Sequence, residues 1–421
     1  MEPEKVQCQF FVLKKKRLCR MTVKIGETFC GEHIAHTKPT ETLDGSSVSL
    51  DEKRVRVPCP FDSTHTCFKS QLAKHMARCN SKPSESKPDY ICPGINAGPA
   101  EEEVPKVRLN DVSDDELLSL INRVNTIYND HVKIIEKIKE HPSLAEEIKR
   151  PDIGAPALKH LLQNSTLISL MEDENLLKDN SCFVEMGAGK GKLTFWIAQA
   201  TKTLQNCKYS LVDISTCRHK SENKLPLEGV SAEVIRVRAN VADLLLEKVE
   251  FHEGCQFVVP VSKHLCGAAT DFALRCVGNS ISSGMSIQTE GLVMALCCHH
   301  RCEWRHYVGK EFFKSVELSP RDFSRMCVLV SWATCGTGKS RLSEEKSADQ
   351  QDPNPHRDRY DRLKLCREVR EEIGRKCKLV IDQGRVDYLQ SLGFNSELVY
   401  YVKQSITLEN VCLIGKKSVK S

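Results

Sequence analysis

The sequence lacks an apolar run long enough to cross a membrane and lacks an apolar signal-peptide core. A membrane helix would need about 18 consecutive apolar residues, and no such run occurs. The first ten residues, MEPEKVQCQF, carry charges where a secretory signal has its apolar segment. We therefore expect a soluble intracellular protein, cytoplasmic or nuclear, with no membrane partner.

Acidic residues are absent between positions 5 and 24, where seven basic residues occur. Residues 1–80 hold 14 Lys and Arg against 9 Asp and Glu, and this surplus of five equals the net charge of +5 of the whole chain. The basic N-terminus indicates binding to a polyanion, although a solvated charged face would have the same composition. The chain of 421 residues is too long for one core, so we expect a large domain with smaller appendages.

Disulfides are not expected for the 21 cysteines, because the cytosol keeps thiols reduced. Metal binding and burial are the remaining roles. A first candidate ligand set is Cys8, Cys19, Cys30 and His33. Cys30 and His33 can chelate from one turn, and the two more distant cysteines complete a tetrahedral zinc site.

A second set, Cys59, His65, His75 and Cys79, has tighter spacing. The stretch CPFDSTH offers a turn, and QLAKHMARC reads as a helix that places His75 and Cys79 on one face. Thiolate and imidazole ligands in a set of four suit structural zinc. Because so short a region has little apolar core, we expect zinc to hold the N-terminal region folded.

The rest of the chain changes character several times. A stretch rich in Pro, Ser and Glu follows the cysteines, and Ser113 and Glu116 then form a capping-box pattern before apolar residues with helical spacing from Leu117 to Ile138. The predicted division is a Cys-Cys-Cys-His finger at 1–40, a Cys-His-His-Cys finger at 55–82, a linker at 83–110, a helical segment at 111–150 and an α/β domain at 151–421 with a polar insertion at 336–361.

From residue 154 onward, helical and strand-like stretches alternate. LKHLLQNSTLISLMEDENLL, KLTFWIAQATKTL and TDFALRCV have helical spacing, whereas SCFVEM, KYSLVDIS, CQFVVPVS, GLVMALCC and MCVLVSW read as strands. The C-terminal stretch reads as a helix and two further strands. The alternation predicts a doubly wound α/β fold, in which helices cover both faces of a mostly parallel sheet.

The stretch FVEMGAGKGKL joins one of these strands to a helix. A phosphate loop needs Gly, four residues and Gly-Lys-Ser/Thr, but here the lysine comes one position early and Leu193 stands at the hydroxyl position. An acidic residue, Glu185, opens the loop and suits a cationic amino group better than a phosphate. This pattern indicates S-adenosylmethionine.

Acidic residues beyond the loop extend this site. Asp213 ends the next strand, 22 positions after Gly191, where an acid that binds ribose hydroxyls is expected, and Asp243 is a candidate near the adenine. The predicted cofactor-binding residues are Glu185, Gly187, Gly189, Gly191, Asp213 and Asp243. A nucleotide or dinucleotide site is the alternative.

A second glycine-lysine stretch, ATCGTGKS at 333–340, does satisfy the relaxed phosphate-loop spacing. The helix that should follow is replaced by RLSEEKSADQQDPNP, which has no apolar face and contains prolines. We interpret this match as accidental.

Two more loops, VSKHLCGAATD and LCCHHRCEWRHY, should lie at the carboxyl edge of the sheet, where ligands bind. For methyl transfer the protein mainly positions the acceptor and removes its proton. Lys263, His264, His299 and His300 are the candidates for that base and for stabilising the developing alkoxide. A metal site in the Cys-Cys-His-His run is disfavoured because adjacent ligands suit a tetrahedral site poorly. Ordinary loop and core roles are the alternative.

Together these stretches resemble the eukaryotic tRNA 2′-O-methyltransferase family that modifies position 4 of the acceptor stem. The resemblance spans nearly the whole chain and rests on KKKRLCR…FCGEH, CPFDSTHT…QLAKHMARC, FVEMGAGKGKL, SKHLCGAATDFALRC, ALCCHHRCEWRHYVGKEFF, SWATCG and IDQGRVDYL. It implies two zinc fingers, a Rossmann-like catalytic domain that uses S-adenosylmethionine, and tRNA as partner. The implied reaction methylates the ribose of cytidine or adenosine. The stretch RANVADL around Asp243 is a loose version of the family pattern.

Three other functions stay open at this point. The enzyme could methylate another RNA atom, such as a base nitrogen. The chain could instead be a non-catalytic RNA-binding relative, or a zinc-finger factor that binds DNA.

Overall fold

The computed structural model describes residues 7–12, 17–19, 21, 23, 28–30, 56–79, 82, 88–100, 104–215, 221–249, 254–284, 287–334 and 357–418. The chain divides into two compact units, residues 1–87 and residues 88–421. No helix in the described ranges is both long and apolar enough to cross a membrane.

The first unit consists of small elements around cysteines. Its strands and helix are β1 Phe11–Val12, β2 Arg17–Leu18, β3 Arg56–Cys59, β4 Asp62–Phe68 and α1 Leu72–Arg78. The strands form two antiparallel pairs, β1 with β2 and β3 with β4. Helix α1 confirms the helix predicted around His75, but it ends at Arg78, so Cys79 follows it in an extended conformation. Buried residues in its first part are the cysteines themselves, with Phe10, Val23 and Phe29 packed around them.

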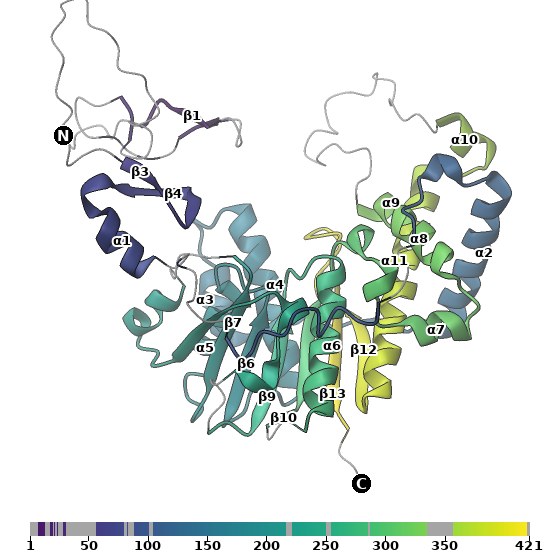
Figure 1. Cartoon of the computed structure of the whole chain (residues 1–421). Coiled ribbons are helices and arrows are strands. Elements are labelled where there is room, and N and C mark those ends of the chain that lie inside the picture. Colours follow the sequence, from purple (N-terminus) through teal and green to yellow (C-terminus); the bar gives the residue numbers. More distant parts are fainter. Residues whose placement is uncertain are drawn as a thin grey trace, which may run out of the picture. The chain divides into compact units, whose positions relative to one another are not determined.

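The second unit is built on a sheet of nine described strands, in the order β5-β12-β13-β11-β9-β6-β7-β8 with β10 beside β9 (Figure 1). The strands are β5 Ile134–Glu136, β6 Ser181–Met186, β7 Lys208–Asp213, β8 Glu233–Arg238, β9 Phe257–Ser262, β10 Gln288–Thr289, β11 Gly291–Ala295, β12 Phe394–Tyr400 and β13 Val411–Lys417. Only β13 runs antiparallel to its neighbours, β11 and β12. The predicted doubly wound, mostly parallel α/β fold is confirmed.

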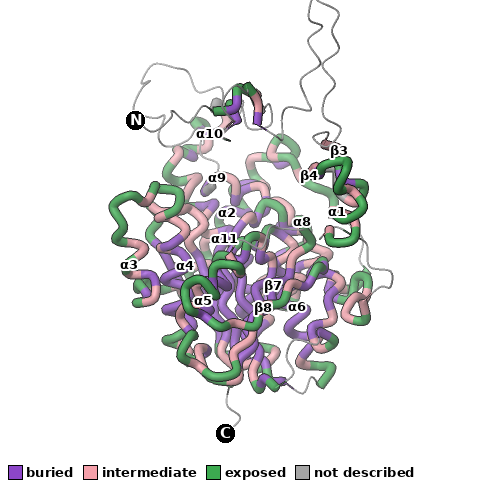
Figure 2. The backbone as a smooth tube through the Cα atoms, turned by 90° about the vertical axis from the view of Figure 1, so that its left-hand side faces the viewer, coloured by how far each residue is buried: buried purple, intermediate pink, exposed green. Residues whose placement is uncertain are grey.

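Helices cover both faces of this sheet. The described helices of this unit are α2 Asp114–His131, α3 Ala145–Ile148, α4 Ala155–Asp173, α5 Lys192–Ala200, α6 Ala268–Ser282, α7 Lys310–Ser315, α8 Pro320–Leu329, α9 Ser331–Thr334, α10 Arg357–Arg362 and α11 Arg367–Ser391. Side chains of α6 and α11 pack on one face, and those of α4 and α5 pack on the other. Figure 2 shows the buried residues concentrated between these layers.

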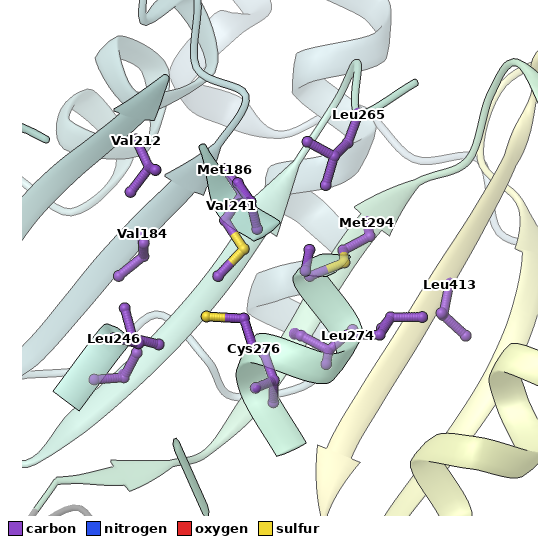
Figure 3. Close-up of a cluster of buried hydrophobic side chains, with 14 of the residues drawn as sticks. Val184, Met186, Val212, Val241, Leu246, Leu265, Leu274, Cys276, Met294 and Leu413 are labelled. Atoms are coloured by element: carbon purple, nitrogen blue, oxygen red, sulfur yellow. The ribbon is translucent and has the colours of Figure 1, made fainter. Parts of the chain in front are cut away.

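Side chains along β6 alternate between the two faces, as the pleat requires. Val184 and Met186 belong to the cluster under α6, together with Leu274 and Met294 (Figure 3). Phe183, the residue before Val184, belongs to the cluster under α4 and α5. Glu185 shares the face of Phe183, so its carboxylate is directed toward α5.

Two predicted elements were wrong. Helix α2 begins with the predicted Ser113–Glu116 capping box but ends at His131, because Ile134–Glu136 pairs with β12 instead. The stretch MCVLVSW is helical rather than a strand. Here a Ser319–Asp322 capping box starts α8, and its apolar residues pack against α11 and α2 in a third cluster away from the sheet.

The linker predicted at 83–110 is in part packed structure. Residues 88–97, which we call the strap, begin the second unit and pair with residues 242–244 of it. Ile91 forms a bridge with Leu244, the Cys92 N–H donates to the Asp243 carbonyl, and the Asn96 N–H donates to the Ala242 carbonyl. The Asn96 side chain is fully buried and donates to the carbonyls of Val241 and Leu244. This part of the predicted linker is therefore held against the rest of its unit by hydrogen bonds.

The polar insertion predicted at 336–361 lies mostly outside the described residues, as does most of ATCGTGKS. Its C-terminal end is part of the fold. In α10, Arg359 donates to the Asp114 carboxylate at 2.8 Å, and Tyr360 is buried beside Trp332. The insertion is thus shorter than predicted.

Candidate active site

The glycine loop lies between β6 and α5, at the carboxyl edge of the sheet. The strand order reverses between β6 and β9, and in open parallel sheets this switch point forms the ligand crevice. Gly187, Gly189 and Gly191 all have positive φ, at 72°, 51° and 66°. A side chain at Gly187 would meet Leu265, and one at Gly191 would meet Leu211. The loop conformation therefore requires glycine.

The middle glycine faces open space. A Cβ added to Gly189 would meet no described atom within 4 Å, so a ligand can approach the backbone there. Asp213, at the end of β7, accepts a bond from the Gly189 N–H at 2.7 Å and another from the Ser215 N–H. Each carboxylate oxygen has a second lone pair, so Asp213 can still accept from a hydroxyl. The loop and Asp213 therefore remain the predicted residues for the sugar and amino acid parts of S-adenosylmethionine.

Glu185 opens the loop from inside the protein. Its carboxylate accepts bonds from the Thr194 N–H at 2.9 Å and the Thr194 hydroxyl at 2.6 Å. Burial raises its pKa to about 7, against the opposing effect of these bonds and of the Lys263 charge. A positively charged ligand group in the crevice would favour its ionised form.

Asp243 has a partner that the sequence did not suggest. Its carboxylate accepts from the Gly94 N–H of the strap at 2.7 Å. The strap therefore fixes the position of the residue predicted to lie near the adenine. The role of Asp243 in cofactor binding stays a prediction.

Lys263 follows β9 across the switch point from Glu185. Its ammonium donates to the His160 carbonyl at 3.0 Å and to Asn164 Oδ1 at 2.7 Å, both on α4. Burial lowers its pKa from 10.5 to about 7, although the Glu185 charge acts in the opposite direction. Since both of these acceptors are neutral, Lys263 can lose its proton near physiological pH.

The three predicted histidines differ in their surroundings. His264 is exposed overall, but its ring lies edge-on to that of His160. Partial desolvation of the ring and the charge of Lys263 lower its pKa from 6.5 to about 4. His300 is exposed at the surface of the next loop. His299 is fully buried, and its Nε2 lies 2.7 Å from Asp382 Oδ1. His299 is placed to position the loop rather than to touch an acceptor.

A buried ion network surrounds His299. Arg385 donates to Asp382 at 2.8 Å and, through a second nitrogen, to Asp271 at 2.7 Å. Burial alone would raise the pKa of Asp382, but His299 and Arg385 lower it. Arg385 also donates to the Cys302 sulfur at 3.2 Å. The network joins α11, α6 and the loop after β11 into one rigid block.

The predicted zinc ligands fall into two clusters in the first unit. The ligand atoms of Cys8, Cys19 and Cys30 lie within 4.8 Å of one another, and so do those of Cys59, His75 and Cys79. His33 and the side chain of His65 lie outside the described residues. The described ligands of each set therefore fit one zinc ion, in agreement with the predicted spacing.

Comparison with known proteins agrees with this geometry. A family profile described as Methyltransferase TRM13 matches residues 162–416. Profiles described as CCCH zinc finger in TRM13 protein and U11-48K-like CHHC zinc finger match residues 6–34 and 56–80. These matches coincide with the α/β unit and with the two cysteine clusters.

Curated relatives extend the match over both units. The tRNA:m(4)X modification enzyme TRM13 homolog of Mus musculus is 36% identical over 97% of this chain and 93% of its own. The human homolog of that name is 35% identical over 98% and 94%, respectively. The tRNA:m(4)X modification enzyme TRM13 of Scheffersomyces stipitis is 31% identical over 96% and 98%.

The class of protein is thus a methyltransferase with two N-terminal zinc fingers, whose cofactors are S-adenosylmethionine and zinc. Within that class, the chain belongs to the TRM13 methyltransferase family. The resemblance seen in the sequence is confirmed.

Several residues of the site were missed by sequence reasoning. His160 and Asn164 lie on α4, about a hundred positions before Lys263, and Asp382 and Arg385 lie on α11. One signal was present for the first pair, because QNST interrupts the apolar residues of α4 with four polar residues that are all buried. No local signal linked Arg385 to Asp271, since 114 positions separate them.

Proposed function

We propose that this protein transfers the methyl group of S-adenosylmethionine to the ribose 2′-hydroxyl of cytidine or adenosine at position 4 of tRNA. Family membership and the names of the relatives, which describe a tRNA:m(4)X modification enzyme, support tRNA and position 4. The choice of the ribose oxygen depends on the chemistry of the site.

The observation that carries this choice is Lys263. A ribose hydroxyl is a weak acid, so its proton must be accepted as the new bond forms, and a base is most effective when its pKa is near the working pH. Burial brings the pKa of Lys263 to about 7, whereas that of His264 is lowered to about 4. Lys263 is therefore the proposed general base. A base nitrogen with a free lone pair would need no such residue.

Other residues of the edge have supporting roles in this proposal. Glu185, Gly187, Gly189, Gly191, Asp213 and Asp243 hold the cofactor, which supplies an electrophilic methyl carbon when bound. His264 and His300 flank the acceptor and favour the charge that develops on its oxygen. His299 acts on the acceptor only through the loop that it positions.

The zinc fingers complete the proposal as the tRNA-binding part. Residues 1–80, which contain them, account for the net positive charge of the chain. Contacts between basic side chains and phosphates bind nucleic acids in a salt-dependent way. Zinc at the two cysteine clusters would hold this basic segment folded.

A substituted tRNA tests the target atom directly. The full chain is incubated with labelled S-adenosylmethionine and a substrate tRNA that carries 2′-deoxyribose at position 4. We expect no transfer to this tRNA and normal transfer to a matched tRNA with deoxyribose at position 5 instead. Mass spectrometry of the normal product should find the added methyl on the ribose fragment.

Other outcomes would favour the alternatives. Transfer to the tRNA with deoxyribose at position 4 would indicate a base atom as target. Binding of tRNA without binding of S-adenosylmethionine in calorimetry would indicate a non-catalytic RNA-binding protein. Equal affinity for duplex DNA and tRNA at fixed salt would contradict the proposed partner.

A further inference from the structure

A third cluster of cysteines lies at the carboxyl edge of the sheet, outside both zinc fingers. The sulfur atoms of Cys266, Cys297 and Cys298 lie within 4.8 Å of one another. Cys298 Sγ is 3.4 Å from Cys266 Sγ, and Cys297 Sγ is 3.9 Å from it. Cys266 follows β9, whereas the other two follow β11, so only the fold brings the three together.

The two finger clusters provide an internal standard for this geometry. Their ligand atoms meet the same limit of 4.8 Å, with sulfur separations of 3.9 Å between Cys19 and Cys30 and 3.6 Å between Cys59 and Cys79. Both coincide with zinc-finger profiles. The third cluster therefore has the spacing of a zinc-ligand set, and it lies outside the residues that the two zinc-finger profiles match.

The backbone holds these cysteines in place. Cys298 has a φ of 56°, a left-handed conformation that is costly for a residue with a side chain and that clusters at functional sites. Its N–H donates to the Glu409 carboxylate at 3.1 Å. Next to Cys266, a Cβ at Gly267 would lie 2.6 Å from the Arg301 carbonyl. The two loops thus pack backbone against backbone beside the sulfur atoms.

We propose that Cys266, Cys297 and Cys298 bind a third zinc ion. Three thiolates are a soft ligand set that suits zinc, and a site with three protein ligands keeps a fourth position for water or substrate. Cys297 is buried and Cys266 is exposed, so the fourth position is reached from the solvent side. Cys266 supplies the separated ligand that the adjacent Cys297 and Cys298 cannot provide.

The proposed ion links the two loops that carry the candidate catalytic residues. Cys266 lies two positions after His264, and Cys298 lies directly before His299. A metal bond across the loops would fix Lys263 and His264 relative to the block that contains His299. This role does not depend on which atom of tRNA is methylated.

Metal content of the full chain, purified under reducing conditions without chelator, tests the proposal. Plasma mass spectrometry should find three zinc ions per chain, and two in each of the variants Cys266→Ser and Cys298→Ser. The matched control Cys366→Ser replaces an exposed cysteine elsewhere and should keep three. Circular dichroism establishes that each variant is folded, and Cys266→Ser, at an exposed position, is the variant that should tolerate the change best.

Cobalt gives a second measurement on the same proteins. Replacement of all zinc by cobalt should produce sulfur-to-cobalt charge-transfer absorption from all three sites. In the Cys266→Ser variant the absorption from one of these sites should be missing. Two zinc ions in the wild type, or an unchanged count in both variants, would overturn the proposal. A disulfide between Cys266 and Cys298 in protein purified under reducing conditions would also overturn it.

Discussion

Lys263 and Arg385 are both buried cations near the carboxyl edge of the same sheet, yet their surroundings are opposite. Arg385 lies between two carboxylates, Asp271 and Asp382. Lys263 donates to a carbonyl and to an amide oxygen, and its pKa falls to about 7. Burial penalises charge at both places, but the two carboxylates bonded to Arg385 outweigh this penalty, whereas the charge of Glu185 offsets only part of it at Lys263.

The difference separates a structural cation from a reactive one. A guanidinium between two carboxylates stays charged and holds α11 to α6. An ammonium with neutral acceptors exchanges its proton near neutral pH, as a general base must.

Replacing the reactive cation should have the largest effect. Lys263→Met removes the proposed base, so methyl transfer to tRNA should fall by about 10² to 10⁴-fold. The free energy of unfolding should not decrease, because the change also removes a desolvated charge. Single-turnover transfer and urea unfolding measure the two quantities.

Lys263→Arg is the sharper companion variant. Its guanidinium keeps the positive charge but cannot lose a proton near pH 7, so transfer should stay as low as in Lys263→Met. Lys202→Met, at an exposed lysine, is the control and should leave transfer unchanged. Activity in Lys263→Arg near that of the wild type would contradict the assignment of the base.

Replacing the structural cation should mainly affect stability. Arg385→Met leaves Asp271 and Asp382 buried without their cation, which should lower the free energy of unfolding by about 3–5 kcal/mol. Arg150→Met, which breaks exposed ion pairs, should change it little. Urea unfolding of the full chain measures both, and equal effects would mean that the network is not stabilising.

The pH dependence of transfer should follow the ionisation of Lys263. Below about pH 7 the amine is protonated, so the transfer rate at saturating substrates should fall about tenfold per pH unit. In the unfolded chain the lysine titrates near 10.5, so between about pH 7 and 10.5 the unfolded state holds the extra proton. The contribution of Lys263 to unfolding free energy therefore rises with pH over that window. A rate independent of pH from 6 to 8 would contradict the prediction.

The smallest effect is expected when the surroundings of Lys263 are made similar to those of Arg385. Asn164→Asp places a carboxylate beside Lys263, as at Arg385, and should raise the pKa of Lys263. The pH profile of transfer should move to higher pH, and the rate at pH 7 should fall about fivefold if that pKa rises from about 7 to about 8. Asn164→Leu removes the acceptor without adding charge and should move the profile the other way. Equal profiles for both variants would show that the rate reports another group.

The sequence predicted best those features that depend on neighbouring residues. The glycine loop was recognised because a strand, an acid, three glycines and a helix follow each other within about a dozen positions, and the structure has them in that order. The helix around His75 and Cys79 was predicted for the same reason. Spacing along one element is fixed by its geometry, so it can be read from the chain.

Features that depend on distant residues were missed or wrong. The apolar run MCVLVSW fits a buried strand or a buried helix equally well, and burial against α11 decided for the helix. No local sequence pattern predicts the partner of Asn164 or of Asp382. Asn164 is 99 positions from Lys263, and Asp382 is 83 positions from His299. Only the packing of α4 and α11 on the sheet brings these groups together.

The strap has a practical consequence for any shortened version of the protein. The methyltransferase profile begins at residue 162, but Asn96 fills a buried position and bonds to Val241, Leu244 and Asn279. A fragment that begins at the profile boundary would leave these groups without their partners and would remove the neighbour of Asp243. A fragment that begins before Pro88 keeps them, so the useful N-terminus of the catalytic part is set by the strap.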